Sequence, residues 1–324
     1  MTVLAMPNRI RIALLVWLAV FAHALFAADE RACPPAPAQP TPEMMQAAMR
    51  DARDHGFLWR ITRDGHTSYL YGTIHVAAFD WMFPGPGVLQ ALRSTDTMAL
   101  ELDMLDPDIR ERMAKGIKSM RSPALPKPLL QRLQRQAAAA CIPYGEIAGL
   151  PVEFQITALT LVEGRREGLE AAYAIDAVLA GIGHGAKKNV VSLETPEAQL
   201  RTLQMQDPRD AVAFVEDGLE EIESGRTRTG FRRIARVWAD ADYDELARYS
   251  EWCDCLNTEI ERKEMRRLLD ERNPNLAERI DSLHASGKRV FAAVGSLHMF
   301  GPTGLPALME KRGYRVERMD LRSK

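Results

Sequence analysis

The sequence predicts an α/β (α+β) fold: a central mixed sheet with two pseudo-repeated strand–GxxH–loop–helix–strand units and a large helical insertion. Two observations support this prediction. Apolar and β-branched runs near both ends of the chain each lead into a G-x-x-H motif, and the middle of the chain has helical spacing of its apolar residues. The 324 residues are 46% hydrophobic and 27% charged, which is typical of a globular protein.

The charge balance argues against a nucleic-acid partner. Lys and Arg number 42 and Asp and Glu number 44, so the formal net charge is -2. No basic excess is available to neutralise a phosphate backbone. A single long apolar run excludes a membrane protein with several spans.

The N-terminus has the pattern of an export signal. Arg9 and Arg11 precede an apolar stretch over residues 12–22, and small residues then offer cleavage positions. We therefore predict a signal peptide over residues 1–27 and a periplasmic or secreted protein. An uncleaved anchor is the alternative, and it would be the protein's only contact with a membrane. The oligomeric state is left open.

The remaining chain divides into two parts. Residues 28–54 form a Pro/Ala-rich linker and N-terminal extension, because the proline-rich stretch 34–42 favours extended conformations. We expect residues 55–322 to form one folded domain.

Four cysteines permit disulfides in an exported chain. Cys253 and Cys255 are too close in sequence to pair easily. If two bridges form, we expect each to include Cys33 or Cys141. Free thiols or a single bridge are the alternative.

The first elements are a β-hairpin and a buried strand. Phe57, Trp59 and Ile61 alternate on one face, and the turn pair at 64–65 leads into a return strand at 68–71. A Gly/Pro-rich loop follows the G-x-x-H motif and precedes a short helix. Residues 97–102 then form a buried strand.

The later elements are helices separated by strands. The pattern is helical from about residue 107 to 181. Further helices extend to about residue 286. Three more strands are expected at 189–194, 289–294 and 314–319. A helix over 305–311 ends at Gly313, and Thr195–Pro196 supplies the N-cap and the first position of another helix.

The two ends of the chain repeat one unit. In the first, a strand leads to Gly72-Thr73-Ile74-His75, an aromatic residue, a Gly-Pro pair, a helix and a strand. In the second, Gly295-Ser296-Leu297-His298 occupies the same place. Because α/β folds build their sites at the ends of strands, we expect His75 and His298 to face one cleft.

Two acids complete the candidate site. Glu101 and Glu194 each end an apolar strand in the similar contexts Ala-Leu-Glu and Ser-Leu-Glu. Burying a charge is costly, so such a carboxylate needs a partner. Two histidines and two carboxylates could hold a divalent ion and activate water. Turn or core histidines and ordinary salt bridges are the structural alternatives.

Arg272 and Asn273 are weaker candidates. Arg272 could bind a substrate carboxylate or a developing oxyanion. Asn273 precedes Pro274, and this pair is a sufficient N-cap signal for the following helix. The sequence contains no H-E-x-x-H, G-x-S-x-G or P-loop motif.

Five segments, in this order, resemble the TraB/GumN family, which includes Tiki-like proteases: GTIHV (72–76), ALELD (99–103), VSLET (191–195), ERNP (271–274) and VGSLHMFG (294–301). The resemblance covers about residues 55–320. It implies a central sheet with helical insertions and, for Tiki-like members, metal-dependent peptide hydrolysis. It also implies functional roles for His75, Glu101, Glu194, Arg272, Asn273 and His298.

We therefore expect an exported divalent-metal-dependent hydrolase, most simply a peptidase that acts on a peptide or protein substrate. His75, His298, Glu194 and Glu101 would bind Mn, Co or Zn. Glu101, Arg272 and Asn273 would be catalytic, with Glu101 as a ligand or as the general base. A metal-independent esterase-like hydrolase and a non-catalytic protein that binds a peptide or polysaccharide precursor are the alternatives.

Overall fold

The computed structural model describes residues 33–36 and 39–322. The predicted signal peptide lies outside these residues. Helix α2 (Pro42–Arg50) begins at the N-cap Thr41, whose side chain accepts from the amide of Met44, and none of its residues is buried. None of the helices in the described ranges has the length and apolar content that crossing a bilayer requires.

A six-stranded mixed sheet forms the centre of the fold, in the order β4-β3-β5-β2-β1-β6. Four neighbouring strands run parallel, and β1 is antiparallel to both β2 and β6. The bounds are β1 (Phe57–Arg63), β2 (His66–Thr73), β3 (Thr97–Leu100), β4 (Asn189–Ser192), β5 (Val290–Gly295) and β6 (Arg315–Met319). The predicted mixed α/β class is confirmed.

The hairpin between β1 and β2 has the predicted turn. Asp64 and Gly65 both have positive φ, 51° and 75°, as a two-residue hairpin loop requires. The turn sets Arg63 opposite His66 and carries the pairing along to Phe57 opposite Gly72. The glycine that starts the first G-x-x-H motif is thereby placed in the sheet.

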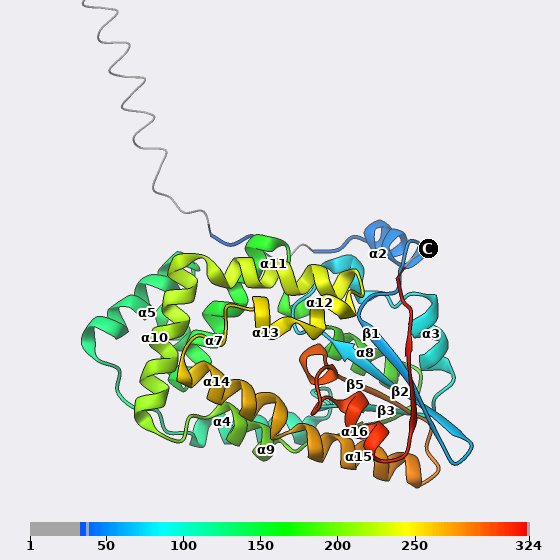
Figure 1. Ribbon diagram of the computed structural model, residues 1–324. Helices are drawn as coiled ribbons and strands as arrows, with labels where there is room; N and C mark the ends of the chain where they lie inside the picture. Colours follow the sequence, from blue (N-terminus) through cyan, green and yellow to red (C-terminus); the bar gives the residue numbers. More distant parts are fainter. Residues whose placement is uncertain (1–32, 37–38, 323–324) are drawn as a thin grey trace, which may run out of the picture.

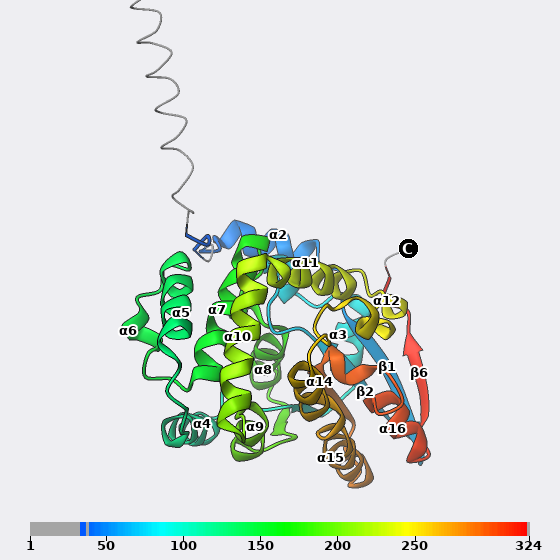
Figure 2. The ribbon, with the colours of Figure 1, turned by 60° about the vertical axis from the view of Figure 1, so that its left-hand side comes forward.

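The two G-x-x-H units start from adjacent strands and then diverge. Thr73 of β2 pairs with Gly295 of β5 in parallel register. The first unit continues through η1 (Phe79–Met82) and α3 (Pro86–Arg93) to β3, on the far side of β5. The second continues through η5 (Ser296–Met299) and α16 (Leu305–Lys311) to β6, at the opposite edge. The crossovers thus run in opposite directions, and Figure 2 shows α16 in front of the sheet and α3 behind it.

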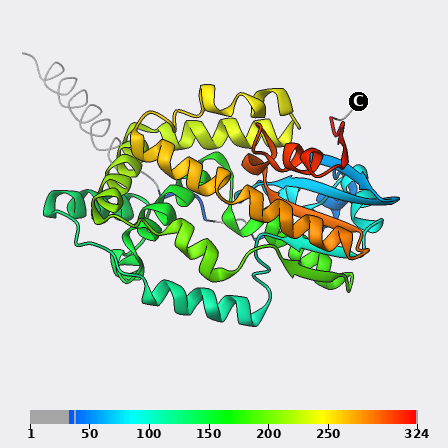
Figure 3. The same ribbon diagram turned by 60° about the horizontal axis from the view of Figure 1, so that its bottom comes forward.

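A large helical part extends to one side of the sheet (Figures 1 and 3). Two long stretches of chain build it, one before β4 and one after it. The first comprises α4 (Pro107–Ser119), α5 (Lys127–Ala139), α6 (Tyr144–Ile147), α7 (Val152–Glu163), η2 (Gly164–Glu167), η3 (Ala171–Tyr173) and α8 (Ile175–Gly185). The second comprises α9 (Pro196–Leu203), α10 (Pro208–Ser224), α11 (Arg226–Ala239), α12 (Tyr243–Ala247), α13 (Tyr249–Trp252), α14 (Glu259–Met265), the π-helical η4 (Arg266–Asp270) and α15 (Asn273–Ala285). The last helix of each stretch, α8 and α15, packs against the sheet itself.

Two hydrophobic clusters support these parts. The larger one surrounds the sheet and includes Trp238, which is 1% exposed and donates its indole N–H to the carbonyl of Gly72 at 2.8 Å. The smaller one joins α5, α7 and α10 through residues such as Leu133, Ile156 and Val215. Helix α11 therefore joins the helical part to the strand that begins the first G-x-x-H motif.

The disulfides differ from the expected pairing. Cys33 bonds to Cys141, and Cys253 bonds to Cys255. The expectation that neighbouring Cys253 and Cys255 would not pair with each other was wrong. Asp254 between them has a left-handed φ of 51°, and the turn leaves the two Cα atoms 5.1 Å apart, within bridging range.

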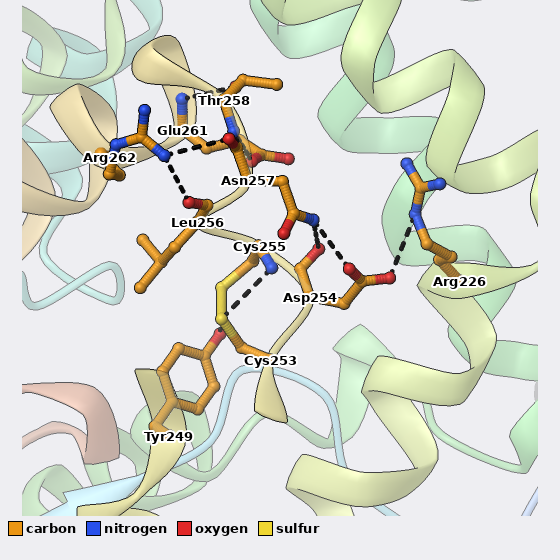
Figure 4. The surroundings of a disulfide bond; sticks show 10 residues. All are labelled: Arg226, Tyr249, Cys253, Asp254, Cys255, Leu256, Asn257, Thr258, Glu261 and Arg262. Carbon is orange, nitrogen blue, oxygen red and sulfur yellow. Dashed lines mark hydrogen bonds and ion pairs between the residues drawn. A yellow bond between two sulfur atoms is a disulfide. The ribbon is translucent and has the colours of Figure 1, made fainter. Parts of the chain in front are cut away.

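Two contacts hold this turn in place (Figure 4). The Asp254 carboxylate accepts from the Asn257 amide at 2.7 Å and pairs with Arg226 at 3.4 Å. The two disulfides, Cys33–Cys141 and Cys253–Cys255, agree with folding in an oxidising compartment.

Candidate functional site

His75 and His298 follow the carboxyl ends of two adjacent parallel strands. Their nearest atoms surround one point above Gly295. A Cβ placed on Gly295 would lie 3.6 Å from Nε2 of His75, 3.6 Å from Cδ2 of His298 and 3.4 Å from Oε1 of Glu101. The two imidazoles therefore share one cleft with Glu101. A side chain at position 295 would intrude on the space between them.

Glu101 and Glu194 follow the next two strands, β3 and β4. The ladder between these strands continues past their ends, since the amide of Glu194 donates to the carbonyl of Glu101 at 3.1 Å. The side chain of Glu101 also accepts from the amide of Gly295 at 2.8 Å. Parallel pairing thus brings both acids to the edge of the sheet that carries the histidines.

Arg272 links the two carboxylates to His298. Its Nη2 donates to Glu101 and to Glu194 at 2.5 Å each, and its Nε donates to Glu194 at 2.9 Å. Its Nη1 lies 3.2 Å from Nε2 of His298. The three charged side chains are only 8–13% exposed, so the guanidinium is the buried counter-charge of both acids.

Asn273 orients His298. Its Oδ1 lies 2.5 Å from Nδ1 of His298, and its Nδ2 donates to the carbonyl of Thr303 at 2.9 Å. Since the amide oxygen can only accept, His298 carries its proton on Nδ1 and directs the Nε2 lone pair toward Arg272. The N-cap interpretation of Asn273 is wrong, because it is the first residue of α15 and its side chain makes no cap bond.

His75 is oriented by Asp176, a residue that the sequence analysis missed. The Asp176 carboxylate lies 3.1 Å from Nδ1 of His75 and comes from the first turn of α8. An acid in the first turn of a helix is common, so no signal in the sequence separates Asp176 from a solvated acid. Both histidines therefore have their Nδ1 atoms held and their Nε2 atoms facing the site.

The surroundings give the two histidines different charge preferences. Burial lowers the pKa of His298 to about 4, and the positive charges of Arg272 and His75 add to this effect against the attraction of Glu101. Burial would also lower the pKa of His75, but Asp176 and then Glu101 outweigh it and raise the pKa. Since the His75 side chain is 61% exposed, solvent moderates that rise. His298 is neutral at pH 7.

Glu101 and Arg272 remain ionised. Burial favours the neutral form of Glu101, but its pKa is lowered to about 2 by His298, which is protonated at the acid pH where Glu101 titrates, by the positive charges of Arg272 and His75, and by the Gly295 amide. Burial opposes the charged form of Arg272, yet Glu194 and Glu101 raise its pKa. The site thus holds a permanent cation between two carboxylates.

A pocket of about 440 Å³ opens from this polar group. His75, Arg272 and His298 line one end of it, and apolar side chains from the helical part line the other. Glu101 and Glu194 do not line this pocket, because Arg272 covers them. A ligand in the pocket would meet imidazole and guanidinium groups before it met a carboxylate.

The donor types fit a divalent metal ion. Imidazole Nε2 atoms whose Nδ1 atoms are held by a carboxylate or an amide, together with a glutamate, are common metal ligands. However, within the part of the chain that the structure describes, no three His, Cys, Asp or Glu side chains are grouped as one ion would need them. His75, His298 and Glu101 have the chemistry of metal ligands and surround one point above Gly295, but they would have to move closer together to bind one ion. Glu194 makes two hydrogen bonds to Arg272 instead.

Comparisons with known proteins give a family and a distant relative. The sequence profile described as the TraB/PrgY/gumN family matches residues 57–318. The chain is similar to a protein of Shigella flexneri named uncharacterized protein YbaP, with 23% identity over 245 residues, 75% of this chain and 87% of that protein. No solved structure gives a significant match.

Proposed function

Since the chain belongs to the TraB/PrgY/gumN family, we propose that it is an exported hydrolase that cleaves amide bonds of a peptide or protein substrate. The observation that carries this proposal is the convergence of His75, His298 and Glu101 around Gly295, with Arg272 beside them. Bases and a fixed cation at the end of a pocket are what hydrolysis of a carbonyl compound requires.

Each side chain has a distinct part in this proposal. Arg272 keeps its charge and would stabilise the negative charge on the carbonyl oxygen through its electric field, because its N–H groups already have acceptors within the site. Asn273 is a positioning residue, because it holds the His298 ring with Nε2 beside Nη1 of Arg272 at the end of the pocket. Asp176 does the same for His75. These fixed contacts reduce the reorganisation that the reaction needs.

A divalent ion, Mn, Co or Zn, would be held by His75, His298 and Glu101 and would supply a Lewis acid and a water of lowered pKa. In that case Glu194 serves to hold Arg272 rather than the ion. Glu101 would be the ligand that also orients Arg272.

A metal-independent hydrolase is the second candidate, and one observation favours it. Arg272 already neutralises both carboxylates, and neutral His298 directs a lone pair into the same space. His298 would then take a proton from water at Nε2, in place of its contact with Nη1 of Arg272, as the water oxygen adds to the carbonyl carbon. The same proton would pass to the leaving group as its bond to the carbonyl carbon breaks, and the charge of Arg272 would stabilise the oxyanion between these steps.

Metal analysis and turnover of the purified protein test these proposals together. We expect bound metal near one equivalent and peptide cleavage that a chelator abolishes. His75→Ala and His298→Ala should release the metal and stop cleavage. His66→Ala is the matched control, because His66 lies exposed on the β1–β2 hairpin away from the pocket.

Other outcomes decide between the alternatives. A metal-free protein that cleaves substrate would support the metal-independent mechanism. A protein that binds peptides but cleaves none across a broad library would overturn the hydrolase proposal and favour a binding protein. Gly295→Ala should impair turnover in either mechanism, because the added methyl group would lie 3.4–3.6 Å from Glu101 and both histidines and narrow the space that water or substrate needs.

A further inference from the structure

The helical part of the chain supplies an apolar wall to the candidate site. The wall lies opposite the polar group and includes Leu161, Phe231, Ile234, Tyr249, Met265 and Leu269. These side chains come from α7, α11, α13, α14 and η4, whereas His75 and His298 follow strands of the sheet. The pocket therefore has a polar end made by the sheet and an apolar end made by the insertion.

Resting on the proposed function, we propose that this apolar end binds a large uncharged side chain of the substrate next to the bond that is cleaved. The substrate class is thus a peptide with Phe, Leu or a similar residue at that position. A pocket of about 440 Å³ is in the range that encloses such groups. The volume also leaves room for the adjoining backbone.

The charges around the pocket argue against an ionic substrate group. Arg272 is the fixed positive group at the polar end, and it contacts Glu101 and Glu194. Its single charge faces two carboxylates, so a substrate carboxylate finds no uncompensated cation. A lysine or arginine side chain would leave water for an apolar wall without a carboxylate to receive it.

The π-helical segment connects the apolar wall to Arg272. Leu268 and Leu269 belong to η4 and both line the pocket, and the carbonyl of Leu268 accepts from Nη1 of Arg272 at 3.1 Å. A side chain that packs against Leu269 therefore lies on the segment that positions the guanidinium. Binding energy from the apolar group can in this way place the carbonyl against Arg272.

Matched peptides that differ only at the position next to the cleaved bond test this proposal. Burying a Phe or Leu side chain instead of Ala should raise kcat/KM by roughly 10- to 150-fold. Phe231→Ala should reduce the ratio of kcat/KM between the Phe and Ala peptides several-fold, mainly through the KM of the Phe peptide. Phe214→Ala is the control, since Phe214 is also partly buried but packs on the other hydrophobic cluster.

A filling variant keeps the test valid if the truncation disturbs folding. Ile234→Trp should shrink the apolar end and shift the preference from Phe toward Ala. Equal cleavage of Phe, Ala and Lys peptides by the parent, or an unchanged ratio in both pocket variants, would overturn the proposal.

Peptide binding separates this proposal from the proposed function. The titration uses the intact protein and a Phe peptide whose scissile amide is replaced by a non-cleavable bond. If no peptide is cleaved but this ligand binds and Phe231→Ala weakens it, the hydrolase proposal fails and the apolar site stands. If peptides are cleaved and Phe231→Ala binds this ligand as the parent does, the apolar site fails and the hydrolase proposal stands.

Discussion

Replacing Arg272 with Met should destabilise the protein strongly, because it leaves two buried acids without their counter-charge. Arg272 makes three hydrogen bonds to Glu101 and Glu194, and the three side chains are 8–13% exposed. Removing one partner of such a buried group costs about 3–5 kcal/mol. Urea unfolding followed by circular dichroism and tryptophan fluorescence would measure the loss.

Two further variants identify the cause of the loss. Arg232→Met removes a comparable pair with Glu167 in which the arginine is 59% exposed, so it should shift the urea midpoint far less than Arg272→Met does. Adding Glu194→Gln to Arg272→Met should recover part of the stability, because one unpaired charge is removed.

The same variants report on the proposed chemistry. Arg272→Lys keeps a positive charge but loses the planar fork that contacts both acids and His298. We expect turnover to fall by about 10²–10³-fold if Arg272 stabilises an oxyanion. An Arg272→Met protein that unfolds at the urea concentration of the parent, with the same slope, would refute the argument that this cation holds the site together.

Two other predictions concern the frame around the site. Replacing Cys33 and Cys141 with Ser should cost more stability than replacing Cys253 and Cys255, because their sequence separations are 108 and 2. The chain-entropy model gives about 4.7 kcal/mol for a loop of roughly 100 residues and less than about 3 kcal/mol for a very short one. Thermal unfolding of both double variants compares them, and equal losses would contradict this account. Burial and Glu261 raise the pKa of Glu221 to about 7, above its unfolded value, so stability from this group is lost as pH rises from about 4.5 to 7. Glu221→Gln should therefore stabilise the protein at pH 8 by about 1–2 kcal/mol after solvent screening, and it should not stabilise the protein at pH 4. Denaturant unfolding at both pH values measures the change in stability. An equal gain at the two pH values would contradict the raised pKa of Glu221.

Local patterns in the sequence were sufficient for the strands and their turn. The alternation in residues 57–61 and the pair Asp64-Gly65 depend only on neighbours in the chain, and the structure has the hairpin they predict. The Thr195–Pro196 helix start is likewise observed, with the Thr195 side chain accepting from the amide of Ala198. Such features are decided by backbone geometry over a few residues.

The repeated motif also predicted where the histidines would meet. A strand that ends in G-x-x-H places its histidine beyond the sheet edge, and two such parallel strands bring both histidines to one edge. The structure adds that β2 and β5 are neighbours and that their units diverge afterward. Strand order depends on long-range pairing, which no local pattern contains.

Contacts between distant segments decided the rest. Asn273 has a local N-cap signal, yet its amide binds His298, because η5 brings the ring beside the start of α15. Asp176 was missed, since only the packing of α8 against the sheet gives it a partner in His75. Cys253 pairs with Cys255 because Asp254 turns the chain back within one residue. The sequence by itself determined the elements and the chemical types at the strand ends. Tertiary structure decided the partners of the charged groups in the site, because these partners lie as many as 171 residues apart, as Arg272 and Glu101 do.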